Sequence, residues 1–139
     1  MRSINCYDKK KAPKAETRER VFYLYTQLRK KPIPQLPLIL EISAMKPPIQ
    51  VVEESMETWR SLRHYQNLSD TGALSERFVS ACAFQMLKAL ESIHQNNVVH
   101  CNVDPDHVMV FLTPFGGDHF RLVDFDNSRI AGSVVHPQY

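Results

Sequence analysis

Residues 98–110 read VVHCNVDPDHVMV, and residues 121–126, further along the chain, read RLVDFD. The apolar runs at both ends of the first stretch predict two short buried strands, and the second stretch predicts a third strand that ends in Asp124. A loop rich in acids, amides and imidazole joins the first two strands. Polar groups on a loop between buried strands are held at fixed separations while they stay accessible, which is typical of a functional site.

The clearest helix of the chain lies directly before this loop. Ser75 is a suitable N-cap, and the helix is expected to end at Asn96 and Asn97. Its apolar side chains recur at intervals of three and four residues, so they form one stripe that is expected to belong to the core. The members of this stripe are Val79, Cys82, Ala83, Met86, Leu87, Leu90 and Ile93.

The first half of the chain predicts a strand, a helix and two more strands. Polar and apolar residues alternate over residues 3–7, and apolar residues at helical spacing over 15–31 predict a helix that ends before Pro32. Apolar runs at 36–42 and 49–53 predict strands, the first of them irregular at its start because of Pro37. The helical spacing is carried by Val21, Leu24, Tyr25 and Leu28.

Shorter elements are expected in the second half of the chain. Residues 61–66 are expected to form a short helix, residues 113–118 a hairpin turn, and residues 120–125 the returning strand. Trp59 is expected to pack at the junction between the two halves.

The composition is that of a globular protein. With 139 residues, 43% hydrophobic and 23% charged, the chain predicts one domain or part of a larger one. A net charge of +2 does not indicate nucleic-acid binding, and the lysines at 9–11 are interpreted as a solvated run. No apolar run approaches the length of a membrane span, and residues 1–3 do not resemble a signal peptide.

The cysteines favour a reducing compartment. Cys6, Cys82 and Cys101 are an odd number without metal-ligand spacing, so no disulfides are expected. A cytoplasmic or nuclear location fits best.

The loop, the later Asp124 and the helix before them resemble the signature of eukaryotic-type protein kinases, in which a catalytic loop H-R-D-L-x-x-x-N precedes a metal-binding D-F-G segment. The resemblance implies an α+β, protein kinase-like fold that is partial. Residues 1–54 would form the end of the small lobe, as a strand, a helix and two strands. Residues 55–139 would form the first part of the helical large lobe, with the catalytic-loop hairpin and the start of the activation segment.

Several positions that carry the chemistry of that family hold other residues here. Asn102 matches the catalytic aspartate, and its neutral amide is a far poorer base than a carboxylate. Cys101 replaces an arginine, and Asp104 puts an anion where the family has a lysine. His107 replaces a metal-binding asparagine, although imidazole prefers softer ions than magnesium.

The nucleotide site implied by the resemblance is also altered. Asp124 keeps the aspartate of the D-F-G segment, whereas Asn5 takes the place of a phosphate-binding lysine and cannot supply its charge. Val52 is expected to close the back of the nucleotide pocket, with Glu53 beside it in the cofactor-binding set. The implied cofactor is ATP with Mg²⁺ or Mn²⁺, bound weakly, with Asp124 and, as a poorer ligand, His107 holding the metal.

These substitutions predict a pseudokinase, a catalytically impaired kinase-like domain that serves as a protein-binding or regulatory scaffold, with a protein such as an active kinase as its partner. Two alternatives stay open. An unconventional active kinase would transfer the ATP γ-phosphate to Ser or Thr of a protein, using Asn102 and a water in place of the base. A truncated product would expose apolar surface and fold poorly alone.

The loop also permits a metal-centre hypothesis, because carboxylates and imidazoles close in sequence can share one ion. The plainer interpretation is that these are turn acids and solvated loop residues, with His100 in a structural role. The residues concerned are His100, Asp104, Asp106, His107, Asp124 and Asp126.

Overall fold

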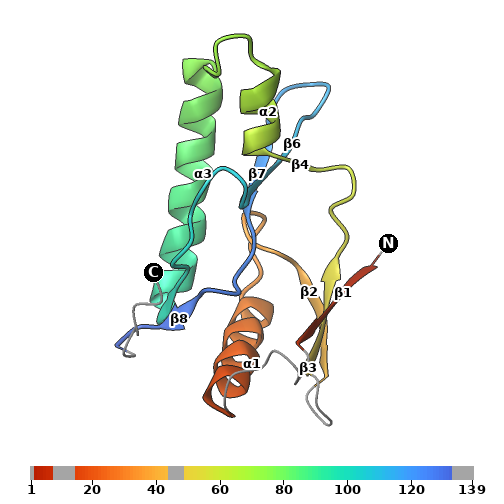
Figure 1. The fold of residues 1–139 in the computed structure, drawn as a ribbon, viewed down its shortest axis with the longest axis vertical. Helices are drawn as coiled ribbons and strands as arrows, with labels where there is room; N and C mark the ends of the chain where they lie inside the picture. Colours follow the sequence, from red (N-terminus) through yellow and green to blue (C-terminus); the bar gives the residue numbers. More distant parts are fainter. Residues whose placement is uncertain (1, 8–14, 44–48, 133–139) are drawn as a thin grey trace.

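The computed structural model describes residues 2–7, 15–43 and 49–132, which form an α+β arrangement with three small antiparallel sheets (Figure 1). The lysines at 9–11 and the segment after residue 132, where an activation segment was expected, lie outside the described residues. The mixed α+β class predicted from the sequence is confirmed, and the division at residue 54 stays a prediction.

The first sheet has the strand order β1-β3-β2, with β1 (Arg2–Tyr7), β3 (Ile49–Glu54) and β2 (Ile39–Ser43). Helix α1 (Ala15–Lys30) packs against this sheet (Figure 1). It ends before Pro32, as predicted, because proline lacks the N–H that a helix interior needs. The four apolar residues whose spacing predicted α1 are all buried, namely Val21, Leu24, Tyr25 and Leu28.

The second sheet has the order β4-β6-β7, with β4 (Arg60–Ser61), β6 (Val108–Phe111) and β7 (His119–Leu122). Antiparallel pairing of β6 with β7 confirms the predicted hairpin turn. The returning strand ends at Leu122, earlier than predicted. Beyond it the N–H of Val123 donates to the carbonyl of His107, and Asp124 has a φ of 60°, which is incompatible with a strand.

Two helices flank this sheet. Helix α2 (Leu62–Leu68) is capped by Ser61, whose hydroxyl accepts from the N–H of His64 at 3.2 Å. Helix α3 (Glu76–Gln95) is capped by Ser75, whose hydroxyl accepts from the N–H of Phe78 at 3.2 Å, and it ends at Asn96. Both caps satisfy N–H groups that have no partner inside the helix. The cap at Ser75 was predicted, whereas Ser61 was expected to be the first residue of the short helix and is instead its cap.

The side chain of Gln85 helps to fix α3 against β7. The amide nitrogen of Gln85 donates to the carbonyl of Asp118 at 2.8 Å, and its oxygen accepts from the N–H of Phe120 at 3.0 Å. Phe120 is fully buried, and its ring meets that of Phe78 edge-on at 5.1 Å. The hairpin and the helix therefore share one core.

The predicted apolar stripe of α3 is only partly core, and that prediction was wrong for three residues. Cys82, Met86 and Ile93 are buried, but Val79 and Leu87 are 49% and 66% exposed. The stripe is wider than the one surface that β7 and β5 (Val98–Val99) offer to α3, so its edge faces away from them. Ala83 is also exposed, and Leu90 is half-buried.

Arg121 of β7 joins the two larger sheets. Its guanidinium donates to the carbonyl of Pro34 at 3.2 Å and lies 3.1 Å from the carboxylate of Glu54. The ring of Trp59 lies 4.6 Å from the guanidinium carbon and 5.6 Å from the ring of Phe111. Trp59 thus packs between the end of β3 and the second sheet, as predicted.

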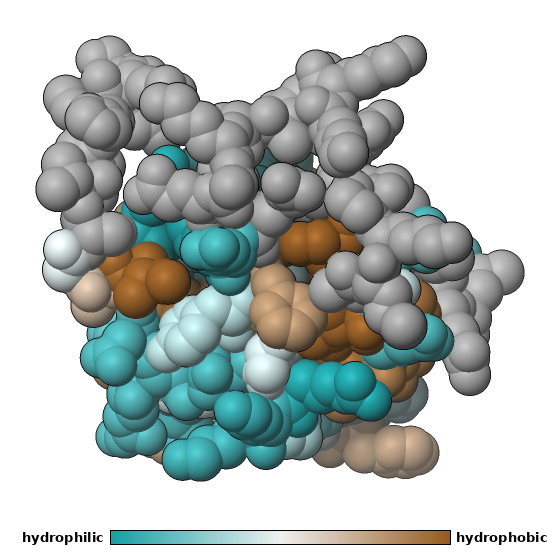
Figure 2. All heavy atoms as spheres, turned by 90° about the horizontal axis from the view of Figure 1, so that it is seen from below, coloured by the Kyte–Doolittle hydropathy of each residue, from teal (hydrophilic) through white to brown (hydrophobic). Residues whose placement is uncertain are grey.

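A third, two-stranded sheet pairs β5 with β8 (Arg129–Ile130) near the end of α3 (Figure 1). Viewed from below the long axis, the described part of the surface is mainly hydrophilic, with separate hydrophobic patches (Figure 2).

Cys82 and Cys101 are free thiols. Among the described residues, no helix combines the length and apolar character that a membrane span requires.

Candidate functional site

His100 anchors the loop that joins β5 to β6. Its Nδ1 accepts from the N–H of Asn102 at 3.2 Å, so its Nε2 carries the proton and donates to the carbonyl of Val123 at 2.9 Å. The side chain is 1% exposed, and burial lowers its pKa, which favours the neutral ring. The ring also meets Phe125 edge-on at 4.9 Å. These contacts are those of the structural residue that was expected.

Asp104 shapes the middle of the loop. Its Oδ1 accepts from the N–H of Asp106 at 2.7 Å and from the N–H of His107 at 3.2 Å. A carboxylate that accepts from backbone two and three residues ahead holds a tight turn in place. This turn places the ring of His107 between two carboxylates.

His107 is the centre of the site. Its Nδ1 lies 3.0 Å from the carbonyl oxygen of Asn102 and 3.0 Å from Oδ2 of Asp104, and its Nε2 lies 2.9 Å from Oδ2 of Asp124. All three neighbours are hydrogen-bond acceptors, so each ring nitrogen donates only if it carries a proton. A ring that holds a proton on each nitrogen would place a positive charge between the two carboxylates.

Asp124 has both carboxylate oxygens engaged by its own chain. Oδ2 faces His107, and Oδ1 accepts from the N–H of Asp126 at 3.2 Å. Its backbone is left-handed, as is that of Cys101, with φ values of 60° and 66°. Such a conformation costs energy in residues other than glycine, and it turns the chain sharply at both ends of the site.

The structure thus brings three of the predicted site residues together. Asn102 and Asp124 are joined through the single imidazole ring of His107, although 22 positions separate the first two in the sequence. The roles assigned to them by the resemblance stay predictions.

The other predicted residues lie in the first sheet. Asn5 on β1 is opposite Val51 of β3 in the register, Val52 is half-buried, and Glu53 is 8% exposed. Because side chains alternate along a strand, Glu53 shares the buried face of β3 with Val51, and α1 covers this face. Their predicted cofactor-binding roles also stay predictions.

The donor set does not fit a magnesium ion as it stands. Magnesium prefers six oxygen ligands, whereas here the imidazole directs one nitrogen at Asp124 and the other at Asn102 and Asp104. Within residues 2–7, 15–43 and 49–132, no group of three or more His, Cys, Asp or Glu side chains is arranged to hold a metal ion.

The six-residue metal centre is therefore not formed in this arrangement. Both ring nitrogens of His100 are bonded to backbone groups. Asp106 lies 3.5 Å from the guanidinium of Arg63 at the surface. The plainer interpretation of these loop acids is the one that the geometry favours.

Two side chains of α1 that support the site could not be identified from the sequence. A guanidinium nitrogen of Arg20 donates to the carbonyl of Asp126 at 3.4 Å, and the hydroxyl of Tyr23 donates to the carbonyl of Asn96 at 3.1 Å. Both bonds fix α1 against segments next to the site. Their acceptors are backbone carbonyls far away in the chain, so side-chain identity alone gave no signal.

Comparison with known proteins shows a partial similarity to one broad class. No family model matches the chain. Nearly half of it is nevertheless similar to serine/threonine protein kinases, so the chain contains a kinase-related region.

Three relatives illustrate the similarity, which in each case covers 46% of this chain. Serine/threonine-protein kinase dkf-2 of Caenorhabditis briggsae is 34% identical over 64 residues. Serine/threonine-protein kinase D2 of Rattus norvegicus is 37% identical over 65 residues, and serine/threonine-protein kinase D3 of Mus musculus is 35% identical over 65 residues. The match spans only 5% of the first relative's length and 7% of the other two.

Proposed function

We propose that this chain is a catalytically impaired, protein kinase-like region that acts as a protein-binding or regulatory scaffold, with weak nucleotide binding. The similarity to serine/threonine protein kinases supports the general class. The proposal goes further than that similarity, and it depends on the chemistry of the site.

The contact between His107 and Asp124 carries the proposal. A carboxylate that helps to hold a nucleotide-bound metal needs lone pairs that point at the ion, and here the Nε2 of His107 lies 2.9 Å from one oxygen while the N–H of Asp126 donates to the other. A divalent ion that approaches this oxygen of Asp124 would meet the imidazole beside it. The histidine therefore competes with the metal for the same oxygen.

Asn102 supports the same conclusion. The resemblance puts it where an active kinase has its catalytic base, but an amide oxygen accepts a proton very poorly. Its backbone carbonyl also takes part in holding His107. The residue is thus a structural part of the loop, and its side chain is left without the chemistry for proton transfer.

The test compares the wild-type chain with a His107→Asn variant. We expect no phosphoryl transfer from labelled ATP to a Ser/Thr peptide mixture with the wild-type chain, and only a small rise of its melting temperature with millimolar ATP and Mn²⁺. In the variant, the oxygen of Asp124 no longer faces an imidazole, so ligand binding should be tighter and the rise of the melting temperature larger. At ten times Kd, a ligand stabilises the native state by about 1.4 kcal/mol, which is a measurable shift.

The matched control is His119→Asn, since His119 is an exposed histidine on β7. It should respond to the ligand like the wild-type chain. Wild-type phosphoryl transfer that requires Asp124 would overturn the proposal, and the Asn102→Ala variant would show whether Asn102 takes part. That result would instead identify the unconventional active kinase, the second candidate, which is favoured by the retention of Asp124 close to the backbone of Asn102.

A further inference from the structure

The side of α3 that faces away from the core has exposed apolar side chains. The main contacts of α3 are with β7 and β5, which lie on one side of the helix (Figure 1). On the opposite side, Phe84 is 61% exposed and Leu87 is 66% exposed. Residues at spacings of three and four share one side of a helix, so these two belong to one exposed stripe. This outer stripe consists of Ser80, Ala83, Phe84 and Leu87, all of them exposed.

The outer stripe has small side chains in its N-terminal half and large ones in its C-terminal half. Two copies can pack with their α3 helices antiparallel, crossing between Ala83 and Phe84. The large residues of each copy then lie opposite the small residues of the other, with Leu87 facing Ser80. Large side chains that pack beside small ones give close contact between helices. A parallel pair would instead place each large residue opposite its own copy.

Charged residues flank the outer stripe symmetrically. Arg77 lies seven residues before Phe84, and Glu91 lies seven residues after it, which is about two helical turns in each direction. Both are exposed, and within the described residues neither forms an ion pair. An antiparallel pair brings Arg77 of each copy beside Glu91 of the other, which gives two ion pairs. A parallel pair would bring like charges together.

The neighbouring acid does not interfere with this arrangement. Glu76 is one position before Arg77, and successive residues are turned by about 100° around a helix axis. Glu76 therefore lies at the other edge of the outer stripe, whereas Arg77 and Glu91 lie at the same edge. In an antiparallel pair, each edge of one helix meets the same edge of the other.

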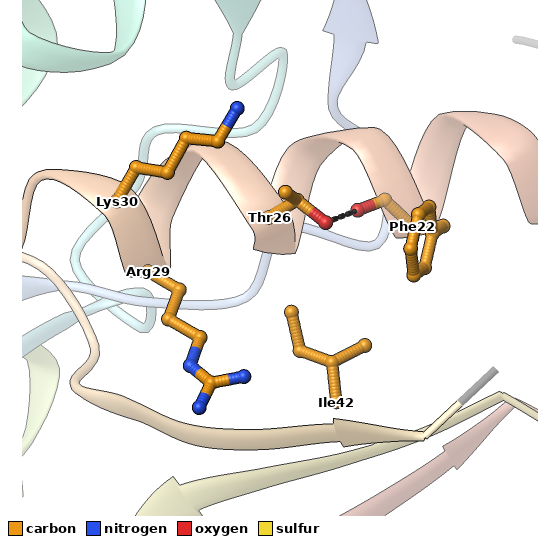
Figure 3. Close-up of a pocket in the computed structure, with 5 residues that line it drawn as sticks. All are labelled: Phe22, Thr26, Arg29, Lys30 and Ile42. Atoms are coloured by element: carbon orange, nitrogen blue, oxygen red, sulfur yellow. Dashed lines mark hydrogen bonds between the residues drawn. The ribbon is translucent and has the colours of Figure 1, made fainter.

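The groove between α1 and β2 also has accessible apolar surface, but it lacks this self-complementary pattern (Figure 3). The charged residues that line it are both cations, Arg29 and Lys30, and the ammonium of Lys30 points away from the groove. The hydroxyl of Thr26 is bonded to the carbonyl of Phe22 at 2.7 Å. A second copy would therefore meet like charges at that groove, and opposite charges at α3.

We propose that the outer stripe of α3 is the interface of an antiparallel dimer of this chain. Apolar contact between the stripes drives the association, and the ion pairs of Arg77 with Glu91 set its direction. One helix face per copy is a small interface, so the dimer is weak, with a Kd on the order of 10–100 µM. The inference goes beyond the proposed function and does not depend on the His107 site.

The test measures self-association of the complete 139-residue chain by sedimentation velocity. From about 5 to about 500 µM, the wild-type chain should pass from monomer to dimer. A Phe84→Glu variant should have a Kd at least about tenfold higher, because a charge is placed at the centre of the stripe. The matched control is Phe115→Glu, which makes the same change at a fully exposed side chain and should leave the Kd unchanged. Thermal melts verify that each variant is folded.

Charge exchange separates a role at the interface from a role inside α3. Arg77→Glu and Glu91→Arg should each raise the Kd about fivefold, since each replaces two attractive pairs by repulsive ones. The double variant Arg77→Glu/Glu91→Arg restores both pairs with their signs exchanged, so its Kd should return to the wild-type value. Lys31→Glu reverses an exposed charge away from α3 and should have no effect.

Cross-linking tests the direction of the two helices. In a Cys6→Ser/Cys101→Ser background, where Cys82 is buried, one chain carries Ser80→Cys and a second carries Leu87→Cys. Oxidation of the mixture by copper phenanthroline should link one chain of each kind. The Ser80→Cys chain alone should stay unlinked, because its two thiols would lie about 10 Å apart along the axis, too far for a disulfide.

Four results overturn the proposal. A chain that stays monomeric would leave the outer stripe to a different protein. A dimer that tolerates Phe84→Glu would use another surface, and failure of the double charge exchange to restore the Kd would exclude the ion pairs. Linkage of the Ser80→Cys chain to itself would exclude the antiparallel direction. His107→Asn should dimerise like the wild-type chain, so phosphoryl transfer by the wild-type chain would contradict the proposed function and leave the dimer intact.

Discussion

The guanidinium of Arg121 lies 3.1 Å from the carboxylate of Glu54, 67 positions away in the sequence. The arginine is 9% exposed and also binds the carbonyl of Pro34 and the face of Trp59. One side chain therefore links β7, the end of β3 and the loop before β2. None of these links follows from the local pattern around residue 121.

Replacing Arg121 with alanine should lower the free energy of unfolding by about 2 kcal/mol, because a buried hydrogen bond and a large contact with Trp59 are lost. Urea denaturation measures this change. Glu54→Gln should cost less than about 1 kcal/mol, since the Glu54 side chain is 48% exposed and water screens its charge. Equal costs would show that the ion pair dominates the junction.

Stability should fall in mild acid because of His100. Burial lowers the pKa of this histidine from its ordinary value of 6.5, so the unfolded chain takes up a proton at a higher pH than the folded chain. The contribution of neutral His100 to the free energy of unfolding is complete above about pH 6.5. It is lost as the pH falls toward the lowered pKa of His100 in the folded chain. Urea midpoints at several pH values between 7.5 and 5 measure this slope.

A His100→Asn variant should be less stable at neutral pH but should show a shallower fall in acid. His119→Asn removes an exposed histidine and should run parallel to the wild-type chain. If the His100 variant keeps the wild-type slope, another group is responsible for the acid sensitivity.

The two described cysteines should differ in reactivity. Cys101 is exposed, whereas Cys82 is 9% exposed and burial raises the pKa of its thiol, which disfavours the reactive thiolate. In a Cys6→Ser background at pH 7.5, a maleimide should modify Cys101 rapidly. It should modify Cys82 only when the chain unfolds. Cys101→Ser should abolish the rapid phase, and its persistence would contradict the burial of Cys82.

The left-handed backbone at Cys101 predicts an unusual ranking of substitutions. At a φ of 66°, glycine avoids a penalty of about 1 kcal/mol that any other side chain incurs. Cys101→Gly should therefore be more stable than Cys101→Ala, and Cys101→Val should be the least stable. Val103 is the control position, because its φ is not positive. In thermal melts, Val103→Gly should be less stable than Val103→Ala.

The sequence predicted the elements whose signals are local. Ser75 caps α3 through a bond to the backbone only three residues away, and Pro32 cannot continue α1. The burial of α3 was predicted less well, because periodicity shows that Val79 and Leu87 share one side of the helix but not that another element covers it.

The site was predicted as a set of residues and not as a geometry. The order and type of residues in the loop pointed to Asn102, His107 and Asp124, and these three do come together. The direct contact between His107 and Asp124 was not predicted, because it depends on a turn formed by Asp104 and on a positive φ at Asp124. Arg20 and Tyr23 were missed because they bind distant carbonyls.

The amide of Gln85 has a consequence for hydrogen exchange. The N–H of Phe120 donates to this side chain of α3 and not to the neighbouring strand of its hairpin. The rate at which this N–H exchanges with deuterium should therefore depend on how often α3 opens, even while the hairpin stays paired. The exchange rate of this one amide proton on β7 would in this way report the stability of a helix that begins more than forty residues earlier.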